Sequence, residues 1–372
     1  MKKVKRLVWG VGMGLILIAL MTSILLAQEK AQFEWKTQTT FALNTWDYVH
    51  CERVLKRIEE LSNGRIKATL FPPGAIVPAF EVLDAVEKGV LHGAFAWDGY
   101  WVGKNTAFTL FASATGGPFG MDNLDFFGWM FFGGGYDLYR ELMADVGYKN
   151  VIPYMVKGEL AEPLGWFRKE IKSADDLKGL KMRVAGLAAD VFRELGVSVV
   201  TVPAGEILPL LDRGVIDATE YSDPHSDLLL GLPDVLKYYH MPGIHQPSGF
   251  TNFYLNRKEW EKLPEDLRKL VQAVCDEMTL KNTIEEWIWG QKALERIEKE
   301  YGVKVIRTPE EILIAFLKAW DKVAARECEK NPLFKKIYDA QREWASKYVP
   351  FRQKFFIDYS IIANYYWEEK KQ

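Results

Sequence analysis

The sequence predicts an α/β protein of two domains that are joined by a long helix. The chain has 372 residues, which is too long for one typical domain of about 100–200 residues. Strand-like and helix-like segments alternate through its first two thirds, a pattern typical of α/β domains with a largely parallel sheet. One helical pattern then runs without a break from residue 265 to residue 301. A helix of that length extends about 55 Å, so we expect it to cross both domains.

The elements of the first domain follow from periodicity and from turn residues. Loose alternation at residues 33–41 indicates a strand, and a helix with a regular apolar stripe then ends at Asn63-Gly64. A second strand at residues 65–71 is stopped by Pro72-Pro73-Gly74. A short helix at residues 80–88 precedes an apolar strand that runs through Ala96.

A second α/β stretch begins near Val151. Its expected strands lie near residues 151–156, 165–168, 181–184 and 197–202, and its expected helices near residues 188–195 and 206–212. The chain ends in helical patterns. The last of them, residues 351–368, follows an expected break at Pro350 and carries Phe355, Tyr359, Ile362 and Tyr366 at helical spacing.

The N-terminus is typical of an export signal. Basic residues among the first six precede an uncharged apolar run from Leu7 to Ala27, after which Gln28 and Glu29 restore polarity. We expect a cleaved signal peptide at residues 1–27. The run is also long enough to span a bilayer, so a retained N-terminal anchor is the alternative. Either way the protein would work outside the cytoplasm, in the periplasm or tethered to the outer face of the inner membrane.

Charge and motifs exclude several classes of function. The formal net charge is -2, and four of the positive charges lie in the first six residues, so the rest of the chain offers no basic block for nucleic-acid phosphates. None of the five histidines forms a zinc motif, and no serine or cysteine nucleophile signature occurs. The cysteines Cys51, Cys275 and Cys328 form no close pair, which favours free thiols inside helices. We therefore predict a binding protein and not an enzyme.

Several ordered motifs resemble the solute receptors of TRAP transporters. These are GRIKATLFPPGAIVPAFEVLDAVEKGVLHGA (64–94), IKSADDLKGLKMRV (171–184) and VPAGEILPLLDRGVIDATEYSDPHSDLLLGL (202–232). The shorter segments YWVGKN, GGPFGM and FFGGGYDLY resemble the branch that captures 2-oxo and 2-hydroxy monocarboxylates such as pyruvate or lactate. The resemblance implies an extracytoplasmic receptor that delivers a small organic acid to TRAP membrane permease subunits.

The same resemblance implies a periplasmic-binding-protein-like cleft fold with a long spine helix and a helical C-terminal tail. The expected division is residues 32–150 with about 247–270 in the first domain, 151–246 with about 271–310 in the second, and 311–372 in C-terminal helices. Some receptors of this branch exchange a C-terminal helix, which implies a homodimer through residues 351–368. A tail helix folded back on its own chain is the alternative.

Arg183 is the residue that the resemblance places on the ligand. It ends the KGLKMR segment, where the family holds the arginine that clamps the substrate carboxylate. A planar guanidinium suits this task because it donates two parallel hydrogen bonds to the two carboxylate oxygens. The alternative is an ordinary solvated arginine at the end of a strand. Tyr100 and Trp101 match the contribution of the first domain to the cleft, and Trp97 and Phe250 are weaker candidates.

The resemblance also implies a metal ion between protein and ligand. Glu162 precedes PLGWF, Glu220 and Tyr221 follow IDAT, and Gln246 follows PGIH, at positions where the branch binds an ion; Glu162 is also expected to contact the substrate. Two of the three side-chain ligands have exchanged type relative to the branch, Gln to Glu and Glu to Gln. All are hard oxygen donors, which suit Ca²⁺ or Na⁺. Unrelated surface carboxylates are the alternative.

Three other functions remain open at the level of sequence. The same scaffold could hold a different organic acid. The chain could be an exported metal-dependent hydrolase or lyase, or a sensor that reports ligand occupancy to a membrane kinase. Thermal shift with a panel of organic acids, with and without Ca²⁺ and a chelator, separates the first two of these functions, and turnover of a bound acid would favour the enzyme.

Overall fold

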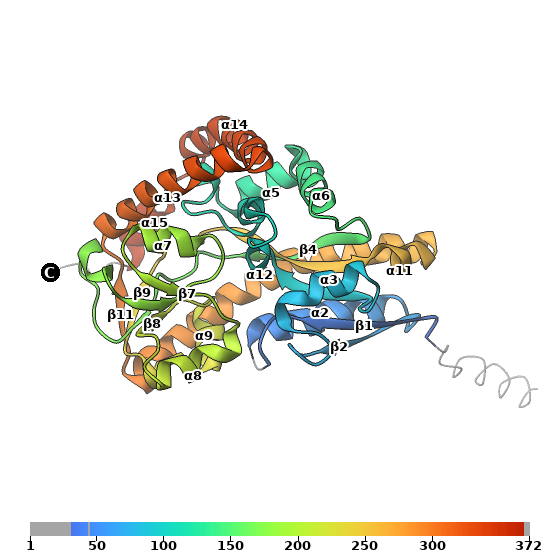
Figure 1. The fold of residues 1–372 in the computed structure, drawn as a ribbon, viewed down its shortest axis with the longest axis horizontal. Coiled ribbons are helices and arrows are strands. Elements are labelled where there is room, and N and C mark those ends of the chain that lie inside the picture. The colour runs from blue at the N-terminus through green and yellow to red at the C-terminus, as the bar shows by residue number, and fades with distance from the viewer. Residues whose placement is uncertain (1–30, 44, 368–372) are drawn as a thin grey trace, which may run out of the picture.

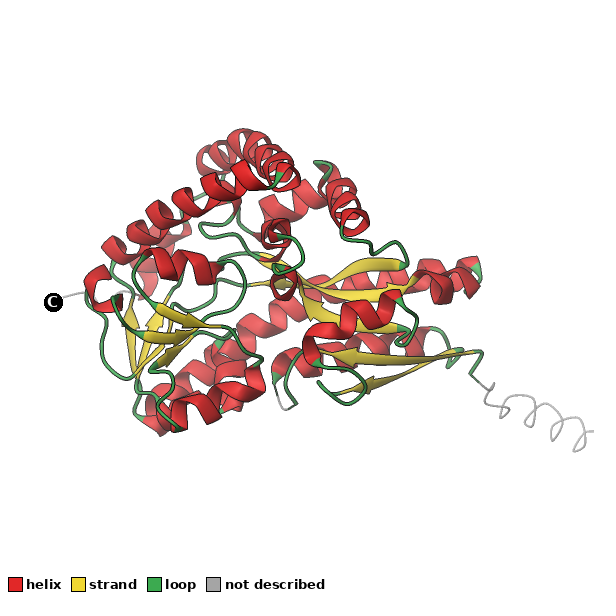
Figure 2. Ribbon diagram, viewed as in Figure 1, coloured by secondary structure: helices red, strands yellow, loops and turns green. Residues whose placement is uncertain are grey.

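The computed structural model describes residues 31–43 and 45–367. The predicted signal peptide or anchor at residues 1–27 lies outside the described residues. Over the described ranges, no helix combines the length and the apolar character needed to cross a membrane. The chain forms two β-sheets that are flanked by helices (Figures 1 and 2), which confirms the predicted α/β cleft fold.

The first sheet has the strand order β2-β1-β3-β10-β4. Its strands are β1 (Phe33–Thr39), β2 (Ile66–Phe71), β3 (Gly93–Trp97), β4 (Val151–Glu159) and β10 (Gly249–Asn256). Parallel pairing joins β1 to β2 and β3, but β10 runs antiparallel to both of its neighbours. The sheet is therefore mixed and not largely parallel as predicted, because β10 enters it directly from the second sheet instead of through a crossover helix.

The second sheet has the order β11-β9-β5-β8-β6-β7. Its strands are β5 (Gly165–Phe167), β6 (Lys181–Arg183), β7 (Ser198–Val200), β8 (Ala218–Thr219), β9 (Tyr238–Met241) and β11 (Lys304–Arg307). The chain passes between the sheets through residues 160–164 and again through residues 242–248. The domain boundaries expected from the sequence stay a prediction.

Helices cover both sheets (Figure 2). They are α2 (Trp46–Leu61), α3 (Val82–Glu87), α4 (Thr109–Ala112), α5 (Asn123–Phe132), α6 (Gly135–Asp145), α7 (Ala188–Glu194), α8 (Ile207–Asp212), α9 (Pro224–Leu230), α10 (Leu232–Val235) and α11 (Arg257–Lys262). The 3-10 helices are Ala79–Glu81, Asp98–Trp101, Thr106–Phe108, Pro118–Gly120, Ala174–Leu177 and Ala204–Glu206. We call the first sheet with α2 and α3 the first lobe, and the second sheet with α7, α8 and α9 the second lobe.

Helix α12 (Glu265–Tyr301) is the long helix that the sequence predicts. Acidic Glu265 and Asp266 lie in its first turn, where they complement the helix dipole. Gly302 ends it in the left-handed conformation at φ 63°, which glycine adopts without strain. The helix packs on β4 and α2 of the first lobe and on α9 of the second, so it connects the lobes (Figure 1).

Three helices end the part of the chain that the structure describes: α13 (Glu310–Lys330), α14 (Pro332–Phe355) and α15 (Tyr359–Trp367). The predicted break at Pro350 is wrong, because α14 continues through this proline to Phe355. Pro350 has no N–H to donate to the carbonyl of Ser346, one turn earlier. Both residues are exposed, so water can take the place of the missing hydrogen bond. The predicted apolar stripe is therefore divided between α14 and α15.

The apolar core has one cluster that spans both lobes and a smaller cluster mainly within each of them. Phe95 and Phe253 stack in the first lobe with ring centroids 4.5 Å apart, and Trp166 and Tyr239 stack in the second at 3.9 Å. The cysteines are free thiols as predicted; Cys51 and Cys275 are buried, and Cys328 is half-buried. One apolar cluster spans both lobes, from Ala94 and Ala96 to Met182, whereas the boundary around Arg183 and Glu220 holds buried polar groups.

Candidate functional site

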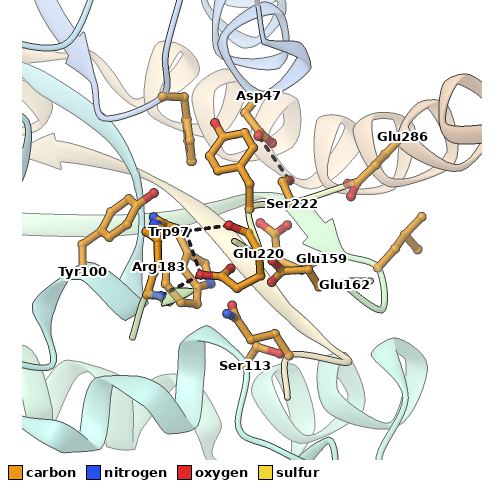
Figure 3. A pocket seen from close by; sticks show the side chains of 15 residues that line it. Asp47, Trp97, Tyr100, Ser113, Glu159, Glu162, Arg183, Glu220, Ser222 and Glu286 are labelled. Carbon is orange, nitrogen blue, oxygen red and sulfur yellow. Dashed lines mark hydrogen bonds and ion pairs between the residues drawn. The ribbon is translucent and has the colours of Figure 1, made fainter. Parts of the chain in front are cut away.

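A small polar cavity lies between the two lobes (Figure 3). The volume open to the centres of water molecules inside it is about 40 Å³. This is a few times the volume that one water molecule needs on the same measure. It is lined by Phe41, Asp47, Trp97, Tyr100, Ser113, Glu159, Leu160, Glu162, Arg183, Ala185, Glu220, Tyr221, Ser222, Gln246 and Glu286. Both lobes contribute to this lining, so the cavity exists only while they are closed on each other.

Arg183 and Glu220 meet because their strands are parallel neighbours. Arg183 ends β6 and pairs with Thr219 of β8, the residue before Glu220. In parallel sheets the carboxyl ends of the strands open into the ligand-binding crevice. Arg183 Nη1 donates to Glu220 Oε1 at 2.7 Å and to the Glu220 carbonyl at 3.2 Å, and Ala185 N donates to the same Oε1 at 2.7 Å.

The guanidinium of Arg183 is fixed on one side and has an available donor on the other. Its Nε donates to the carbonyl of Val202 at 3.1 Å, and the side chain is only 1% exposed. Its Nη2 is buried and has no hydrogen-bond partner among the described residues. Buried donors are nearly always satisfied in native proteins. The geometry therefore leaves Nη2 for a ligand.

Glu162 and Gln246 lie on the two segments that pass between the sheets. These segments are tied together, since Glu162 N donates to the Gln246 carbonyl at 3.0 Å and Gly243 N donates to the Glu162 carbonyl at 2.8 Å. A side chain at Gly243 would meet that same carbonyl at 2.5 Å, so only glycine allows the close approach. The pairing holds both polar side chains at the lobe boundary, where they line the cavity.

Two carboxylates share one buried region of the site. Burial raises the pKa of Glu162 to about 8. Burial, and then the neighbouring Glu162, raise the pKa of Glu220 well above its ordinary value, although Arg183 opposes the change. Glu162 Oε1 and Glu220 Oε2 are both buried without a hydrogen-bond partner in the described part of the chain. Two close, desolvated carboxylates repel each other unless a proton or a cation neutralises them.

His245, which is not among the residues predicted from the sequence, completes this group. One ligand atom each from Glu162, Glu220 and His245 lie within 4.8 Å of one another. Burial lowers the pKa of His245 to about 4, so its imidazole is neutral and carries a free lone pair. Two hard carboxylate oxygens with the nearby Gln246 amide fit Ca²⁺ or Na⁺ better than zinc. The donor set therefore fits the metal ion expected from the sequence.

Aromatic side chains form the wall on the first-lobe side. Trp97 donates from Nε1 to the Ala112 carbonyl at 3.3 Å, and its ring meets Tyr100 edge-on at 5.4 Å. Gly99 and Gly186 flank this indole, and a Cβ on Gly99 would meet it at 1.9 Å. Burial raises the pKa of Tyr100 to about 12, so its phenol stays protonated and can donate a hydrogen bond.

The structure brings six of the predicted site residues to one cavity and places another elsewhere. The six are Arg183, Tyr100, Glu162, Glu220, Tyr221 and Gln246. Trp101 is corrected: it is 1% exposed in the core, and its Nε1 donates to Tyr254 at 3.2 Å. Successive side chains of a 3-10 helix point about 120° apart, so Tyr100 faces the cavity while Trp101 faces the core. The weaker candidate Phe250 is also in the core, stacked on Phe126.

The acidic side of the cavity is not predicted from the sequence. Asp47, Glu159 and Glu286 line it, together with the hydroxyl of Ser222. Their signal in the sequence is weak, because each lies in an otherwise ordinary helix, strand or loop. For His245 a signal existed, since it directly precedes the selected Gln246.

The chain matches a protein family over most of its length. The model of the family described as bacterial extracellular solute-binding protein, family 7 (DctP), matches residues 39–331. A curated relative from Nostoc sp., named monocarboxylate 2-oxoacid-binding periplasmic protein, is 34% identical over 322 residues, which are 87% of this chain and 85% of the relative.

Solved structures give the same result. A TRAP transporter solute-binding protein of Bordetella bronchiseptica, described as a mixed-occupancy dimer with copurified calcium and picolinate, aligns with a TM-score of 0.82 at 30% identity, over 91% of this chain and 97% of its own. One from Colwellia psychrerythraea with calcium and pyruvate has a TM-score of 0.81 at 26% identity, over 90% of this chain and 100% of its own. One from Pseudoalteromonas atlantica with sodium and pyruvate has a TM-score of 0.80 at 26% identity, over 90% of this chain and 99% of its own.

Proposed function

This chain belongs to the bacterial extracellular solute-binding proteins of family 7, and from that premise we propose that it captures a small 2-oxo or 2-hydroxy monocarboxylate together with a metal ion. The family consists of solute receptors, so the prediction of a binding protein and not an enzyme is confirmed. Pyruvate and lactate are the ligands of the proposed size. The observation that carries the proposal is the buried, unpartnered Nη2 of Arg183 beside the Glu162–Glu220 pair.

Arg183 would hold the ligand carboxylate. Its Nη1 and Nε are already engaged, so Nη2 is free to donate a charge-assisted hydrogen bond to the ligand. The Tyr100 phenol, which lines the same cavity beside Arg183 (Figure 3), can donate to another ligand oxygen. The cavity volume supports a ligand of only a few heavy atoms, because about 40 Å³ leaves no room for a long chain without lobe opening.

Glu162, Glu220 and Gln246 would hold the ion, with Tyr221 contributing through its backbone carbonyl. When bound, the ion supplies positive charge to a region that otherwise has too little. With an ion bound in place of the protons that their raised pKa values favour, Glu162 and Glu220 would carry two negative charges and the ligand a third, against the one positive charge of Arg183. A divalent ion makes this group neutral, whereas a monovalent ion leaves a buried negative charge, which is costly. Charge balance therefore favours Ca²⁺ over Na⁺.

The protein would deliver its ligand to a TRAP membrane permease from the periplasmic side, after export directed by residues 1–27. The tail supports assembly of two copies. Every residue of α15 is exposed, including large apolar ones such as Tyr359, Ile362 and Tyr366. A monomer rarely exposes such a patch. We propose a homodimer through residues 351–368, in place of a tail folded onto its own chain.

Thermal shift and calorimetric titration of the chelator-treated protein test the proposal. We expect pyruvate and lactate to raise the melting temperature when Ca²⁺ is present, to do so less with Na⁺, and to leave it unchanged when both are replaced by choline. Succinate and longer 2-oxo acids serve as matched comparisons. Absence of binding by every 2-oxo and 2-hydroxy acid with either ion would refute the proposal. Conversion of a bound acid, followed by NMR, would favour the metal-dependent enzyme.

A further inference from the structure

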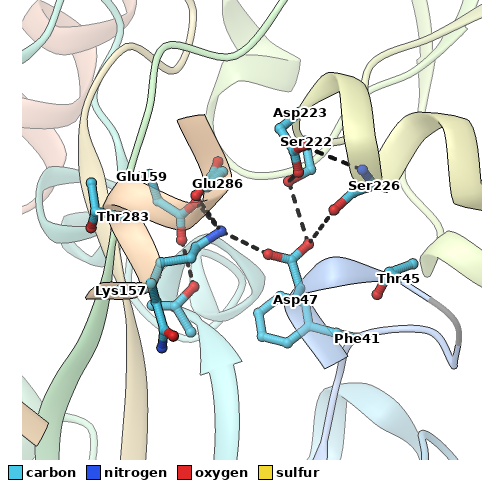
Figure 4. Close-up of polar contacts among 12 residues, drawn as sticks. Phe41, Thr45, Asp47, Lys157, Glu159, Ser222, Asp223, Ser226, Thr283 and Glu286 are labelled. Atoms are coloured by element: carbon cyan, nitrogen blue, oxygen red, sulfur yellow. Dashed lines mark hydrogen bonds and ion pairs between the residues drawn. The ribbon is translucent and has the colours of Figure 1, made fainter. Parts of the chain in front are cut away.

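A buried group of charges, which we call the Lys157 cluster, lies beside the cavity (Figure 4). Lys157, only 2% exposed, points from β4 toward three carboxylates. Its Nζ lies 2.7 Å from Asp47 Oδ1, 2.9 Å from Glu159 Oε2 and 3.1 Å from Glu286 Oε2. These carboxylates also line the ligand cavity, whereas Lys157 stands behind them. The cluster therefore forms the boundary of the cavity on the side away from Arg183.

Asp47 is the member of this cluster that reaches the other lobe. It lies in the first turn of α2, in the first lobe. Its Oδ1 accepts from Lys157, but its Oδ2 accepts from the hydroxyls of Ser222 and Ser226, each at 3.4 Å. Ser222 follows β8 and Ser226 lies in α9, both in the second lobe. One carboxylate thus joins the two lobes across their boundary.

Both ends of this contact are held in place by their own lobe. Burial would lower the pKa of Lys157, but Asp47, Glu159 and Glu286 outweigh it, so the pKa stays well above its ordinary value and the ammonium stays charged beside Asp47. On the other side, Asp223 caps α9 by accepting from His225 N at 2.7 Å and Ser226 N at 3.3 Å. The acceptor and the donors are thus oriented before they meet.

The serines are coupled to the proposed ligand site through the chain itself. Ser222 follows Glu220 and Tyr221 directly, so an ion and ligand held by Glu220 would fix the segment that carries the Ser222 hydroxyl. Opening of the lobes would separate Asp47 from both serines and leave its bond to Lys157 intact. The Ser222 hydroxyl could then donate to Asp223 Oδ2, which lies 3.5 Å away in the same lobe, and water would satisfy the Ser226 hydroxyl.

We propose that Asp47, held in place by its contact with Lys157, is a positioning residue that latches the closed lobes through Ser222 and Ser226 and so slows release of the ligand. The inference rests on the proposed receptor function and adds to it a determinant of ligand residence that does not need to touch the ligand. Ser226 allows a role in lobe closure to be told apart from direct contact with the ligand, because it is fully buried and is not part of the cavity lining.

Ser226→Ala tests the latch, with dissociation of pyruvate measured by stopped-flow tryptophan fluorescence in Ca²⁺. We expect dissociation to be about fivefold faster, which is less than a bond to a charged group usually contributes, because 3.4 Å is long for a hydrogen bond. The association rate should not change, and small-angle scattering with subsaturating ligand should show more of the open form. Ser198→Ala, an exposed serine of β7 in the same lobe, is the matched control. Asp47→Asn, which keeps the shape but removes the charge, should accelerate release further.

Three results would overturn the latch. One is unchanged dissociation from Ser226→Ala, and another is an equal acceleration in the Ser198→Ala control. The third is a purely structural effect, in which Ser226→Ala lowers the melting temperatures of the free and ligand-bound proteins equally without faster release. A wild-type protein that binds no acid would instead refute the proposed function, and with it the coupling to ligand.

Discussion

Replacement of Arg183 by lysine tests the ligand clamp with the least disturbance to the fold. Lysine keeps a positive charge near Glu220 but loses the Nη2 donor that is unpartnered within the described chain. One charge-assisted hydrogen bond is worth about 1.5–3 kcal/mol. Arg183→Lys should therefore weaken pyruvate binding roughly 10- to 100-fold, because every 1.4 kcal/mol is about tenfold in affinity.

Alanine is a poorer choice at this position. Arg183 and Glu220 are each 1% exposed, and their contact at 2.7 Å is a buried ion pair. Removal of one partner from such a pair costs about 3–5 kcal/mol, because the other charge is left unpaired. Arg183→Ala would therefore change folding and binding together, whereas lysine keeps Glu220 paired.

Isothermal titration with pyruvate in Ca²⁺ gives the affinity, and the melting temperature of the ligand-free protein shows whether the fold is kept. Arg168→Lys is the matched control. Arg168 also donates to a backbone carbonyl, that of Leu211 at 2.7 Å, but it lies outside the cavity lining. Unchanged affinity in Arg183→Lys, or an equal loss in Arg168→Lys, would refute the clamp.

Two further predictions concern stability and assembly. Burial raises the pKa of Asp98 to about 7, even though Tyr139, Tyr254 and Asn252 donate to it. The folded state therefore binds the carboxyl proton of Asp98 more tightly than the unfolded state does. The stability that the protonated Asp98 contributes is complete below about pH 4 and is lost as the pH rises to 7. Asp98→Asn should therefore gain stability relative to the wild type between pH 4 and pH 7, by up to about 4 kcal/mol in urea unfolding, and a pH-independent difference would contradict this. A chain ended at Tyr348 should be monomeric by light scattering while the full chain is dimeric; a monomeric full chain at micromolar concentration, or a dimer that survives truncation, would refute assembly through the tail.

Local sequence patterns contain most of the fold. The strand β1 and the helix α12 were predicted within two residues of their observed ends, because periodicity and stop signals such as Gly302 act over short distances. The continuation of α14 through Pro350 was not predicted, because a proline interrupts a helix only where the freed carbonyl has no other partner. The antiparallel course of β10 depends on which sheet the chain returns to, which no local pattern records.

The site divides in the same way. Arg183 and Glu220 can be predicted together because each follows or ends a strand of the parallel part of the second sheet. Lys157 cannot, because its partners Asp47 and Glu286 lie more than a hundred residues away in sequence and meet it only when the helices pack on β4. In sequence it is one charged residue among many. Burial and pairing are properties of the packed lobes.

The distribution of charge around the cavity accounts for the proposed preference for monocarboxylates. Among the residues described as lining the cavity, Arg183 is the one cation, and it stands at the end shared with Glu162 and Glu220. A second carboxylate on the ligand would face Asp47, Glu159 and Glu286, whose nearest cation, Lys157, is already shared among all three. Such a group would lose its hydration without gaining a partner, which is the most costly arrangement for a buried charge. Dicarboxylates such as succinate are therefore expected to be excluded by electrostatics as well as by size.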